Sequence, residues 1–364
     1  MISSAEIQAL RAAHELSRTP GVPPGPNPRV GCVLLSPTGV TVGSGFHRGA
    51  GTAHAEIDAL TQAGDQATGA TAVVTLEPCN HVGRTSPCAQ ALISAGVARV
   101  VYAVADPGVD SAGGADTLRA AGIDVVYLGD ASSDDAIGAE PAYRAVIEQL
   151  RPWIFSTQHE RPFVTLKTAS SLDGRVAAAD GSSRWITGVQ ARAEVHELRT
   201  QVDAIMIGTS TAITDDPSLT ARSANGNLLD YQPLRVIVGK RDLQPGSQLM
   251  RQDSAGGEVK HLRTHDIAQV LDTLHRQQVH HVLVEGGPTL STAFIQAGLV
   301  NQWISYVAPL IVGSGPSVVG DLGTVTMSQA TRWRVVGVAS VGADVKIMAE
   351  PVHLHEATSD RRGA

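Results

Sequence analysis

The sequence predicts an α/β protein of two domains. Its 364 residues are long for a single domain. Apolar strand-like runs alternate with helical stretches in both halves, and a polar segment over 156–161 separates the halves. A hydrophobic content of 43% and a charged content of 17% are typical of a globular protein with a sizeable core. We therefore expect domains over residues 1–150 and 160–352, followed by a flexible tail over 353–364.

The first domain begins with a helix, because Ser3 and Glu6 form a capping-box pattern before an apolar stripe. Further apolar runs predict strands over 30–35, 40–46, 72–76, 99–104 and 123–127. Helices are expected from His54 to about residue 64, from about residue 87, and between the last two strands. A final helical stretch that includes Tyr143 and Leu150 is expected to end at Arg151-Pro152.

The second domain alternates in the same way. Strands are expected over 163–169, 203–208, 234–238 and 281–284, and helices over 189–200 and 289–298. This alternation predicts a mainly parallel sheet covered by helices, with antiparallel strands near the end. Glycine-rich turns follow two of the strands, at 208–211 and 285–289. In open α/β sheets ligands bind at such strand ends, and glycines beside a helix N-terminus suit a pyrophosphate.

Lys167 is unusual because it falls within an otherwise apolar strand. Burying an unpaired ammonium group is expensive. We therefore expect a counter-ion for Lys167, which Glu285, the substrate or a cofactor phosphate would supply.

Composition restricts the possible partners and the compartment. The net charge is −7, from 28 basic and 35 acidic residues, and there is no basic tract of the kind that binds nucleic acid. The N-terminus lacks the pattern of a secretion signal, and no apolar stretch approaches the ~20 residues that span a bilayer. Three cysteines do not make a disulfide framework. We expect a cytoplasmic protein that binds a small phosphorylated molecule, and neither nucleic acid nor membrane.

One stretch carries the signs of metal chemistry: His54, Cys79 and Cys88 make a Cys₂His set, which leaves a fourth zinc position open for water. Glu56, two residues after His54, is suited to move protons to and from that water. The pattern H-x-E…P-C marks zinc-dependent deaminases of bases and nucleosides. The alternative is a structural site with Cys32 as a fourth ligand, or cysteines that only fill the core, and neither would give Glu56 a role.

Motifs in both halves match one known family. They lie at 26–33, 45–47, 54–56 and 75–88 in the first half, and at 161–164, 166–167, 171–175, 185–187, 215–220, 284–287 and 308–309 in the second. Together they resemble the bifunctional enzyme of riboflavin biosynthesis, which couples a pyrimidine deaminase to a reductase of the attached phosphoribosyl sugar. The long insertion between Cys79 and Cys88 separates this family from cytidine and tRNA-adenosine deaminases.

The resemblance implies a cytidine-deaminase-like, three-layer first domain in which His54, Cys79 and Cys88 hold zinc and Glu56 is the catalytic proton shuttle. It further implies substrate contacts from Asn27, His47, His81 and Arg84, with Arg84 near the phosphate. Two positions depart from the family, since Gly108 replaces an asparagine and Ala115 replaces a glycine. The loss of a side chain at position 108 predicts weaker substrate binding rather than altered chemistry.

For the second domain the resemblance implies a dihydrofolate-reductase-like fold that uses NADPH. Matching positions place these residues toward the substrate: Lys167, Ser183, Arg199, Leu219, Arg222 and Glu285. They place these toward the cofactor: Ala169, Trp185, Thr187, Thr211, Asp215, Gly287, Pro288, Thr289 and Leu290.

The implied function is hydrolytic deamination of 2,5-diamino-6-(5-phosphoribosylamino)pyrimidin-4-one, followed by NADPH-dependent reduction of its ribosyl group to ribityl. One alternative is a stand-alone zinc deaminase of nucleosides or bases with a non-catalytic C-terminal domain. Another is a zinc-stabilised ligand-binding or regulatory protein with both sites degenerate, against which the intact Glu56 and Lys167 argue. The sequence leaves the oligomeric state open, with a homo-oligomer as one option.

Overall fold

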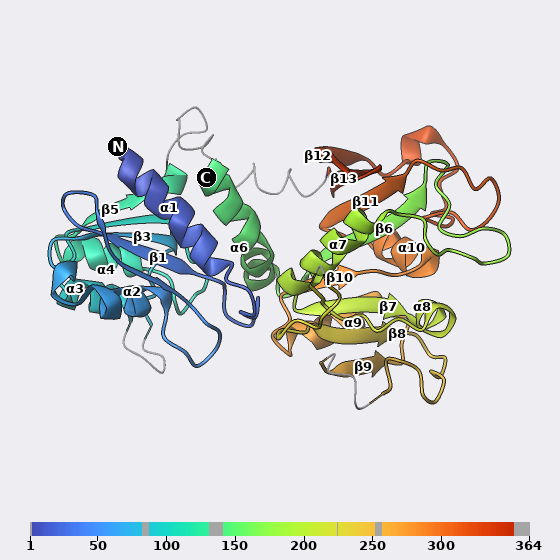
Figure 1. Cartoon of the computed structure of the whole chain (residues 1–364), viewed down its shortest axis with the longest axis horizontal. Helices are drawn as coiled ribbons and strands as arrows, with labels where there is room; N and C mark the ends of the chain where they lie inside the picture. Colours follow the sequence, from blue (N-terminus) through green and yellow to red (C-terminus); the bar gives the residue numbers. More distant parts are fainter. Residues whose placement is uncertain (1, 82–86, 131–140, 224, 252–256, 353–364) are drawn as a thin grey trace. The chain divides into compact units, whose positions relative to one another are not determined.

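The computed structural model describes residues 2–81, 87–130, 141–223, 225–251 and 257–352. The chain divides into two compact units, residues 1–160 and 161–364, each built on one β-sheet (Figure 1). The predicted tail over 353–364 lies outside the described residues. No helix in the described ranges is both long enough and apolar enough to cross a membrane.

The sheet of the first unit has five strands in the order β2-β1-β3-β4-β5. Their bounds are β1 (Gly31–Leu35), β2 (Thr41–Phe46), β3 (Thr71–Leu76), β4 (Arg99–Val104) and β5 (Asp124–Tyr127). β1 pairs antiparallel with β2 and β3, whereas β3, β4 and β5 are parallel to one another. The carboxyl ends of β3 and β4 therefore lie side by side, and the chain that follows each of them shares one edge of the sheet.

Helices cover both faces of this sheet, which gives three layers. One face is covered by α1 (Ser4–Ser17) and α6 (Pro141–His159), which pack on alternate residues such as Val33, Val73 and Val101. The opposite face is covered by α2 (Ala55–Ala63), α3 (Cys88–Ser94) and α4 (Gly114–Ala120). The predicted capping box of α1 is present, with the Ser3 hydroxyl accepting from the Glu6 amide.

The helix that ends the first unit is longer than predicted. α6 continues through Pro152 to His159, so the predicted end at Arg151-Pro152 is wrong. Proline removes one backbone hydrogen bond inside a helix, but Trp153 and Ile154 pack against the same core as Val146 and Leu150. Packing of this apolar face therefore holds the helix together beyond the proline, and the boundary between the units falls after residue 160.

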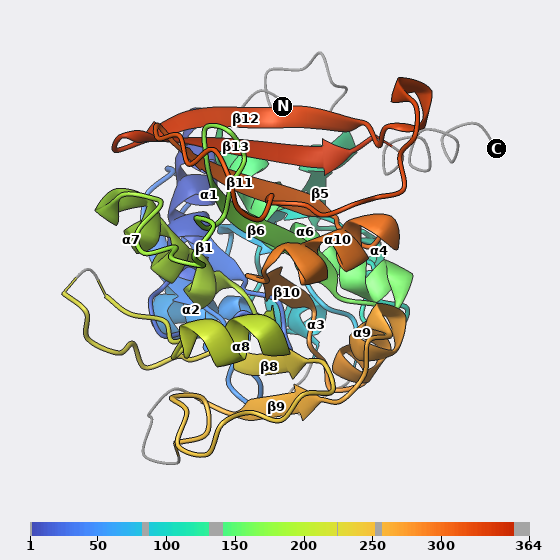
Figure 2. The same cartoon turned by 90° about the vertical axis from the view of Figure 1, so that its right-hand side faces the viewer.

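The sheet of the second unit has eight strands in the order β12-β13-β11-β6-β10-β7-β8-β9. Their bounds are β6 (Phe163–Ser171), β7 (Ala204–Gly208), β8 (Leu234–Val238), β9 (Val259–Leu262), β10 (His281–Val284), β11 (Gln302–Ala308), β12 (Trp333–Val341) and β13 (Asp344–Pro351). The six strands from β11 to β9 are parallel, and β13 and β12 add antiparallel strands at one edge. Figure 2 shows β12 at this edge and β9 at the other.

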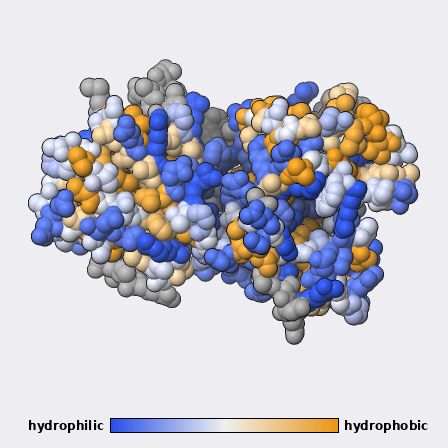
Figure 3. All heavy atoms as spheres, viewed as in Figure 1, coloured by the Kyte–Doolittle hydropathy of each residue, from blue (hydrophilic) through white to orange (hydrophobic). Residues whose placement is uncertain are grey.

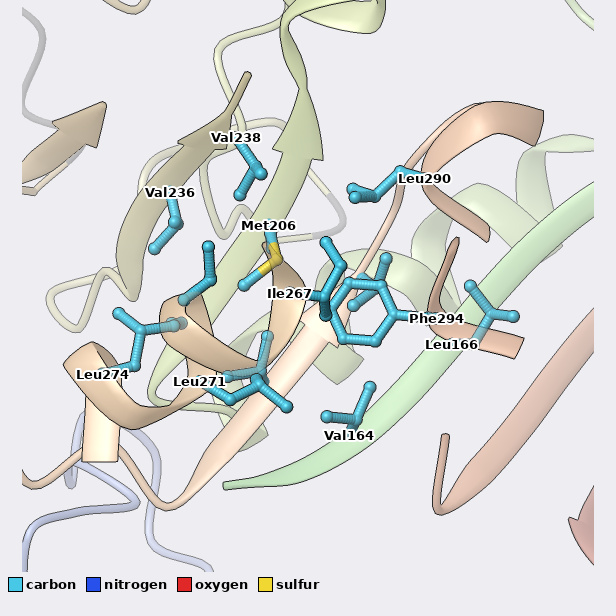
Figure 4. Packing of buried hydrophobic residues seen from close by; sticks show 14 of the residues in the cluster. Val164, Leu166, Met206, Val236, Val238, Ile267, Leu271, Leu274, Leu290 and Phe294 are labelled. Carbon is cyan, nitrogen blue, oxygen red and sulfur yellow. The ribbon is translucent and has the colours of Figure 1, made fainter. Parts of the chain in front are cut away.

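Helices among the described residues cover both faces of this sheet. α9 (Ile267–His275) and α10 (Pro288–Gln296) pack on one face, where Figure 4 shows Phe294 and Leu271 against Val164 and Met206. On the opposite face lie α7 (Val189–Leu198) and α8 (Thr209–Asp215). The carboxyl ends of the parallel strands stay uncovered by this packing and lead into the loops that line the pocket described below.

The packing of α6 predicts where the chain can be divided. A fragment of residues 1–150 lacks Trp153, Ile154 and the buried Ser156, whereas a fragment of residues 1–160 keeps them. Losing this packing costs about 2 kcal/mol or more. We therefore expect the Tm of the shorter fragment to be lower by about 4 °C or more in circular dichroism at saturating zinc. Equal Tm values would show that residues 151–160 add nothing to the first unit.

Candidate active sites

In the first unit, three potential metal ligands meet at the carboxyl end of β3. His54 is the N-cap of α2, Cys79 follows β3 by three residues, and Cys88 is the first residue of α3. The Sγ atoms of Cys79 and Cys88 lie 3.5 and 3.3 Å from His54 Nδ1. Within the described ranges these three residues form the one group of His, Cys, Asp or Glu whose ligand atoms cluster for a metal, all within 4.8 Å of one another.

These separations fit a tetrahedral zinc ion. Bond lengths of about 2.3 Å to sulfur and about 2.0–2.1 Å to nitrogen place such ligand atoms about 3.6 Å apart. Cys32 is not part of the group; its thiol is fully buried in the core between the sheet and α2, and burial raises its pKa. The cluster thus offers three protein ligands and leaves one position open, which is the arrangement of catalytic rather than structural zinc.

Glu56 lies in the first turn of α2, beside this cluster, with 3% of its surface exposed. Burial raises the pKa of Glu56 to about 7. A bound divalent cation would lower this pKa, because it stabilises the carboxylate. Whereas the pKa of Glu56 is raised, the pKa of the neighbouring Cys79 thiol is lowered by hydrogen bonds from Cys88 and His54. A buried carboxyl group with a raised pKa, beside a thiol with a lowered pKa, is suited to accept and return a proton.

Asn27 and His47 lie beside the Cys₂His cluster, as the next contacts show. His47 Nδ1 lies 3.0 Å from the Ala53 carbonyl, so this nitrogen carries the hydrogen, and Nε2 accepts from the Asn27 amide at 3.1 Å. The His47 ring stands edge-on to His54, with 5.3 Å between ring centroids. His81 follows Cys79 by two residues, and its buried Nδ1 has no hydrogen-bond partner among the described residues. Arg84 lies outside the described residues.

Glu77 ties the loop after β4 to the segment after β3 that carries Cys79. Its carboxylate accepts from the Asp106 amide at 3.2 Å and from the Ala115 amide at 3.0 Å. Ala115 lies within α4, so alanine fits the backbone there. A side chain does not fit at the neighbouring Gly114, because a Cβ there would fall 1.8 Å from the Pro78 carbonyl oxygen. The departure at 115 is therefore compatible with the fold.

At position 108, where glycine replaces the asparagine of the family, a neighbouring side chain takes up the free space. A Cβ on Gly108 would fall 2.2 Å from the hydroxyl oxygen of Ser111. The Gly108 amide donates to the Asp106 carboxylate at 2.8 Å, which fixes the turn. The hydroxyl of Ser111 thus occupies space that a side chain at 108 would take.

In the second unit, one pocket of about 1170 Å³ opens at the carboxyl ends of the parallel strands. All the residues predicted to face substrate line it: Lys167, Ser183, Arg199, Leu219, Arg222 and Glu285. So do all those predicted to face the cofactor: Ala169, Trp185, Thr187, Thr211, Asp215, Gly287, Pro288, Thr289 and Leu290. The two sets come from strands, helices and loops far apart in sequence, and the sheet gathers them into one cavity.

A buried ion cluster lies in this pocket. Glu285 follows β10 and accepts from Arg199 at 2.7 and 3.1 Å, while Lys167 Nζ lies 3.2 Å from its second oxygen. The ion pair supplies the counter-ion expected for Lys167. Burial alone would raise the pKa of Glu285, but Arg199 and Lys167 outweigh burial and lower it to about 2. Glu285 therefore stays ionised and keeps both cations in place.

Trp185 presents an aromatic ring to the pocket, with 68% of the residue exposed. Arg192 holds the ring, since its guanidinium carbon lies 4.4 Å from the ring centroid and its Nη1 donates to the Thr187 carbonyl at 2.7 Å. Arg184 donates to the Asp215 carbonyl at 2.6 Å, which links the Trp185 segment to the end of α8. The exposed ring is available for stacking against a flat ligand.

Sequence reasoning missed several residues that line this pocket. Tyr306 on β11 is 1% exposed, and its hydroxyl has no hydrogen-bond partner among the described residues. His196 on α7 reaches the Thr220 carbonyl through Nδ1 at 3.1 Å. The one signal for His196 is its spacing of three residues from Arg199, which places both on one side of the helical segment. Tyr306 gave no signal, because strand order is not readable from sequence.

Comparison with known proteins agrees with this division of the chain. Residues 3–104 match the cytidine and deoxycytidylate deaminase zinc-binding region, and residues 162–347 match the RibD C-terminal domain. The riboflavin biosynthesis protein RibD of Mycobacterium tuberculosis (strain ATCC 25618 / H37Rv) is 45% identical over 320 residues, which cover 88% of this chain and 90% of that protein. The chain belongs to the RibD family.

Further RibD proteins extend the likeness. RibD of Escherichia coli (strain K12) is 38% identical over 357 residues, covering 88% of this chain and 92% of that protein. The solved structure of Acinetobacter baumannii RibD, form 1, superposes with a TM-score of 0.82 at 37% identity and covers 96% of this chain and 99% of that one. A deaminase/reductase structure from Thermotoga maritima gives a TM-score of 0.81 at 29% identity, covering 95% of this chain and 99% of that one.

The RibD match confirms the α/β fold class, with a cytidine-deaminase-like domain followed by a reductase domain. The chain is a bifunctional enzyme of riboflavin biosynthesis, a deaminase and a reductase. Its two domains indicate zinc and a nicotinamide cofactor. The alternative of a stand-alone deaminase with a non-catalytic C-terminal domain has no support, because the C-terminal half matches a reductase family.

Proposed function

We propose that this RibD protein deaminates a phosphoribosylated diaminopyrimidinone in its first unit and reduces the product with NADPH in its second. The observation that carries the proposal is the pairing, in one chain, of a Cys₂His cluster beside a buried glutamate with a pocket that holds a Lys–Glu–Arg ion cluster. The Thermotoga maritima relative is described as a diaminohydroxyphosphoribosylaminopyrimidine deaminase and 5-amino-6-(5-phosphoribosylamino)uracil reductase. We assign the same substrate to this chain.

In the deaminase unit we assign His54, Cys79 and Cys88 as the zinc ligands. Zinc held by these residues would act as a Lewis acid and make water a nucleophile at neutral pH. Glu56, buried beside the cluster, takes a proton from the attacking water and returns it to the leaving amine. Asn27 and His47, which already hydrogen bond to each other, face the pyrimidine, and we assign His81 and Arg84 to the same substrate.

In the reductase unit, a bound nicotinamide cofactor would supply a hydride for C1′ of the sugar, and the chain positions the reactants. We assign the Trp185–Thr187 segment, Ala169, Thr211, Asp215 and the 287–290 turn to NADPH. Lys167 and Glu285 present a cation and an anion to the sugar. Arg199 fixes the position of the Glu285 carboxylate through its own ion pair with it. Ser183 and Leu219 complete the substrate contacts.

We assign the phosphate of the substrate to Arg222 in the reductase, with Arg199 in a supporting role. Arg199 donates from Nε and Nη2 to Glu285 and from Nη1 to the Thr220 carbonyl, so its donors are largely engaged. Arg222 donates from Nε to the Thr220 hydroxyl and from Nη1 to the Gly226 carbonyl. Its remaining Nη2 edge is suited to an anion, because a guanidinium group stays charged and directional.

We propose a cytoplasmic location, since Cys79 and Cys88 must remain reduced to bind zinc. A labelled copy of the full chain that fractionates with the periplasm or membrane would refute this.

Substitutions at Glu56 and Cys88 separate metal binding from proton transfer. Glu56→Gln should keep about one zinc per chain and release no ammonia, because the amide cannot accept the proton of the attacking water. Cys88→Ser should lose zinc and deamination together, because it removes a soft ligand. Metal analysis and an ammonia-release assay measure both. Loss of zinc in Glu56→Gln, or retained deamination, would reject the assignment of Glu56.

Substitution of Arg222 tests its assignment to the phosphate of the substrate. Truncating one partner of a desolvated charge pair costs about 2–5 kcal/mol, so Arg222→Ala should lower reductase kcat/KM about 30-fold or more. Deamination should hardly change, and a dephosphorylated substrate should erase the difference from wild type. Arg199→Ala should instead impair reduction of both substrates, since it leaves Glu285 with one cation fewer. If Arg222→Ala impairs both substrates equally, its role is in the fold.

We further propose that the enzyme is a homo-oligomer that associates through β12 and β13. β12 is an edge strand, and valines of the two strands are exposed by 57% at Val335, 66% at Val338 and 39% at Val345. Figure 3 shows hydrophobic side chains at the surface of the second unit. Edge strands with apolar surface favour association.

Light scattering tests the association. Val338→Lys should lower the measured mass toward that of one chain, because it places an ammonium group in the contact. Val109→Lys is the matched control, since Val109 is 99% exposed in the first unit. A wild-type enzyme that is monomeric at micromolar concentration, or a Val338→Lys variant of unchanged mass, would contradict the proposal.

A further inference from the structure

One side of α7 forms a wall of the reductase pocket, and a polar residue of this side, His196, has no role in the assignments above. Residues at helical spacing line the pocket: Arg192, Val195, His196 and Arg199. Steps of three and four residues place them in one stripe along the helix. Arg192 holds the Trp185 ring at one end of this stripe, and Arg199 holds Glu285 at the other. His196 therefore lies between residues assigned to the cofactor and residues assigned to the substrate.

The backbone carbonyl of Thr220 fixes the His196 ring. Nδ1 lies 3.1 Å from this oxygen, which can only accept, so Nδ1 carries the hydrogen. Burial lowers the pKa of His196, and the Arg199 cation lowers it further, so the ring is neutral at pH 7. Nε2 is then an acceptor. It makes no hydrogen bond with any described residue and is not sealed inside the protein, so it stays open to a ligand in the pocket.

Thr220 also places His196 beside the residues assigned to the substrate. Arg199 donates through Nη1 to the Thr220 carbonyl at 2.9 Å, and Arg222 donates through Nε to the Thr220 hydroxyl at 3.0 Å. Thr220 is 3% exposed, so these contacts are held inside the protein. The imidazole is thus a neighbour of Arg222, which is assigned to the phosphate, and of the Arg199–Glu285 ion pair, which is assigned to the sugar.

Hydrogen-bonding capacity decides what His196 can bind. Lys167, Arg199 and Arg222 can only donate. Glu285 can accept, but its two oxygens already bind Arg199 and Lys167. A sugar hydroxyl needs an acceptor for its own hydrogen, and a hydrogen left unpaired in a desolvated pocket weakens binding. With the phosphate at Arg222 and C1′ at Lys167, the groups of the closed ribose ring that can donate between them are the 2′- and 3′-hydroxyls, and Nε2 of His196 is an acceptor placed for one of them.

We propose that His196 Nε2 accepts a hydrogen bond from the 2′- or 3′-hydroxyl of the substrate's ribose, and so makes the reductase select a ribosyl substrate over its deoxy forms. This inference rests on the proposed function, because it requires the phosphorylated sugar in this pocket. It adds a residue that determines specificity for the sugar and that lies outside the motifs of the family resemblance.

Steady-state reduction by the full-length protein tests this. The absorbance of NADPH gives KM and kcat for 5-amino-6-(5-phosphoribosylamino)uracil and for its 2′-deoxy and 3′-deoxy forms. His196→Ala removes the acceptor, whereas the amide of His196→Gln can donate to the Thr220 carbonyl and accept from a hydroxyl. His159→Ala is the matched control, because His159 Nδ1 also lies 3.0 Å from a backbone carbonyl, but this exposed residue does not line the pocket.

We expect wild type to show a KM about tenfold higher for at least one deoxy form, because that form leaves Nε2 without its donor. His196→Ala should raise the KM of the ribosyl substrate by about the same factor and leave kcat within about twofold, since it removes binding that is equal in the ground and transition states. The same variant should not raise the KM of that deoxy form further, because the partner is already missing. His196→Gln should recover part of the loss, His159→Ala should match wild type, and ammonia release should be unchanged in every variant.

An equal rise of KM for all three substrates in His196→Ala would overturn the inference, because it would assign His196 to the phosphate or to the fold. So would an unchanged KM, or a loss confined to kcat. A wild-type enzyme that takes both deoxy forms as readily as the ribosyl substrate would also contradict it. Failure of the proposed function looks different, since wild-type protein would then oxidise NADPH with none of the three substrates, whatever the variants do.

Discussion

Parallel pairing of the central strands is the constraint on which both sites depend. Parallel neighbours require crossover connections, so helices cover both faces of each sheet and the carboxyl ends of the strands are left at one edge. In the first unit this edge receives Cys79 after β3 and the Asp106 loop after β4. In the second unit it receives Glu285 after β10, Thr211 in α8 after β7 and Lys240 after β8. Each site therefore follows from one topological rule.

Much of this arrangement could be predicted from local sequence. Most of the predicted strands and helices are present within a residue or two, because their apolar runs are long and bounded by turn residues. The zinc cluster was predictable for another reason: His54, Glu56, Cys79 and Cys88 are reactive residue types at a characteristic spacing. α9 also carried a clear signal in Ile267, Val270, Leu271 and Leu274, whose spacing is that of one helix face, although it was not predicted.

Other features depend on contacts that a sequence does not display. Pro152 marks a helix end by local rules, but the packing of Trp153 and Ile154 carries α6 past it. Tyr306 enters the pocket because β11 pairs with β6, where it lies opposite Ala169. Lys240 and Arg241 line the pocket because β8 is a parallel neighbour of β7, so the turns after both strands share one edge of the sheet. The family resemblance located the residues of this pocket that were predicted to face substrate and cofactor, which periodicity alone would not have separated from ordinary turns.

The two sites differ in how their buried ionisable groups are compensated. In the reductase, the chain itself supplies the compensation, since Arg199 and Lys167 surround Glu285 and hold its pKa near 2. In the deaminase, a carboxyl group and two thiols share a buried space with the His54 imidazole, and burial raises the pKa of Glu56 to about 7. Ionising such a cluster without a cation is unfavourable. A bound divalent ion would stabilise both thiolates and the carboxylate together, so metal binding and the protonation state of Glu56 are coupled in the first unit, whereas the ion cluster of the second unit is complete without a ligand.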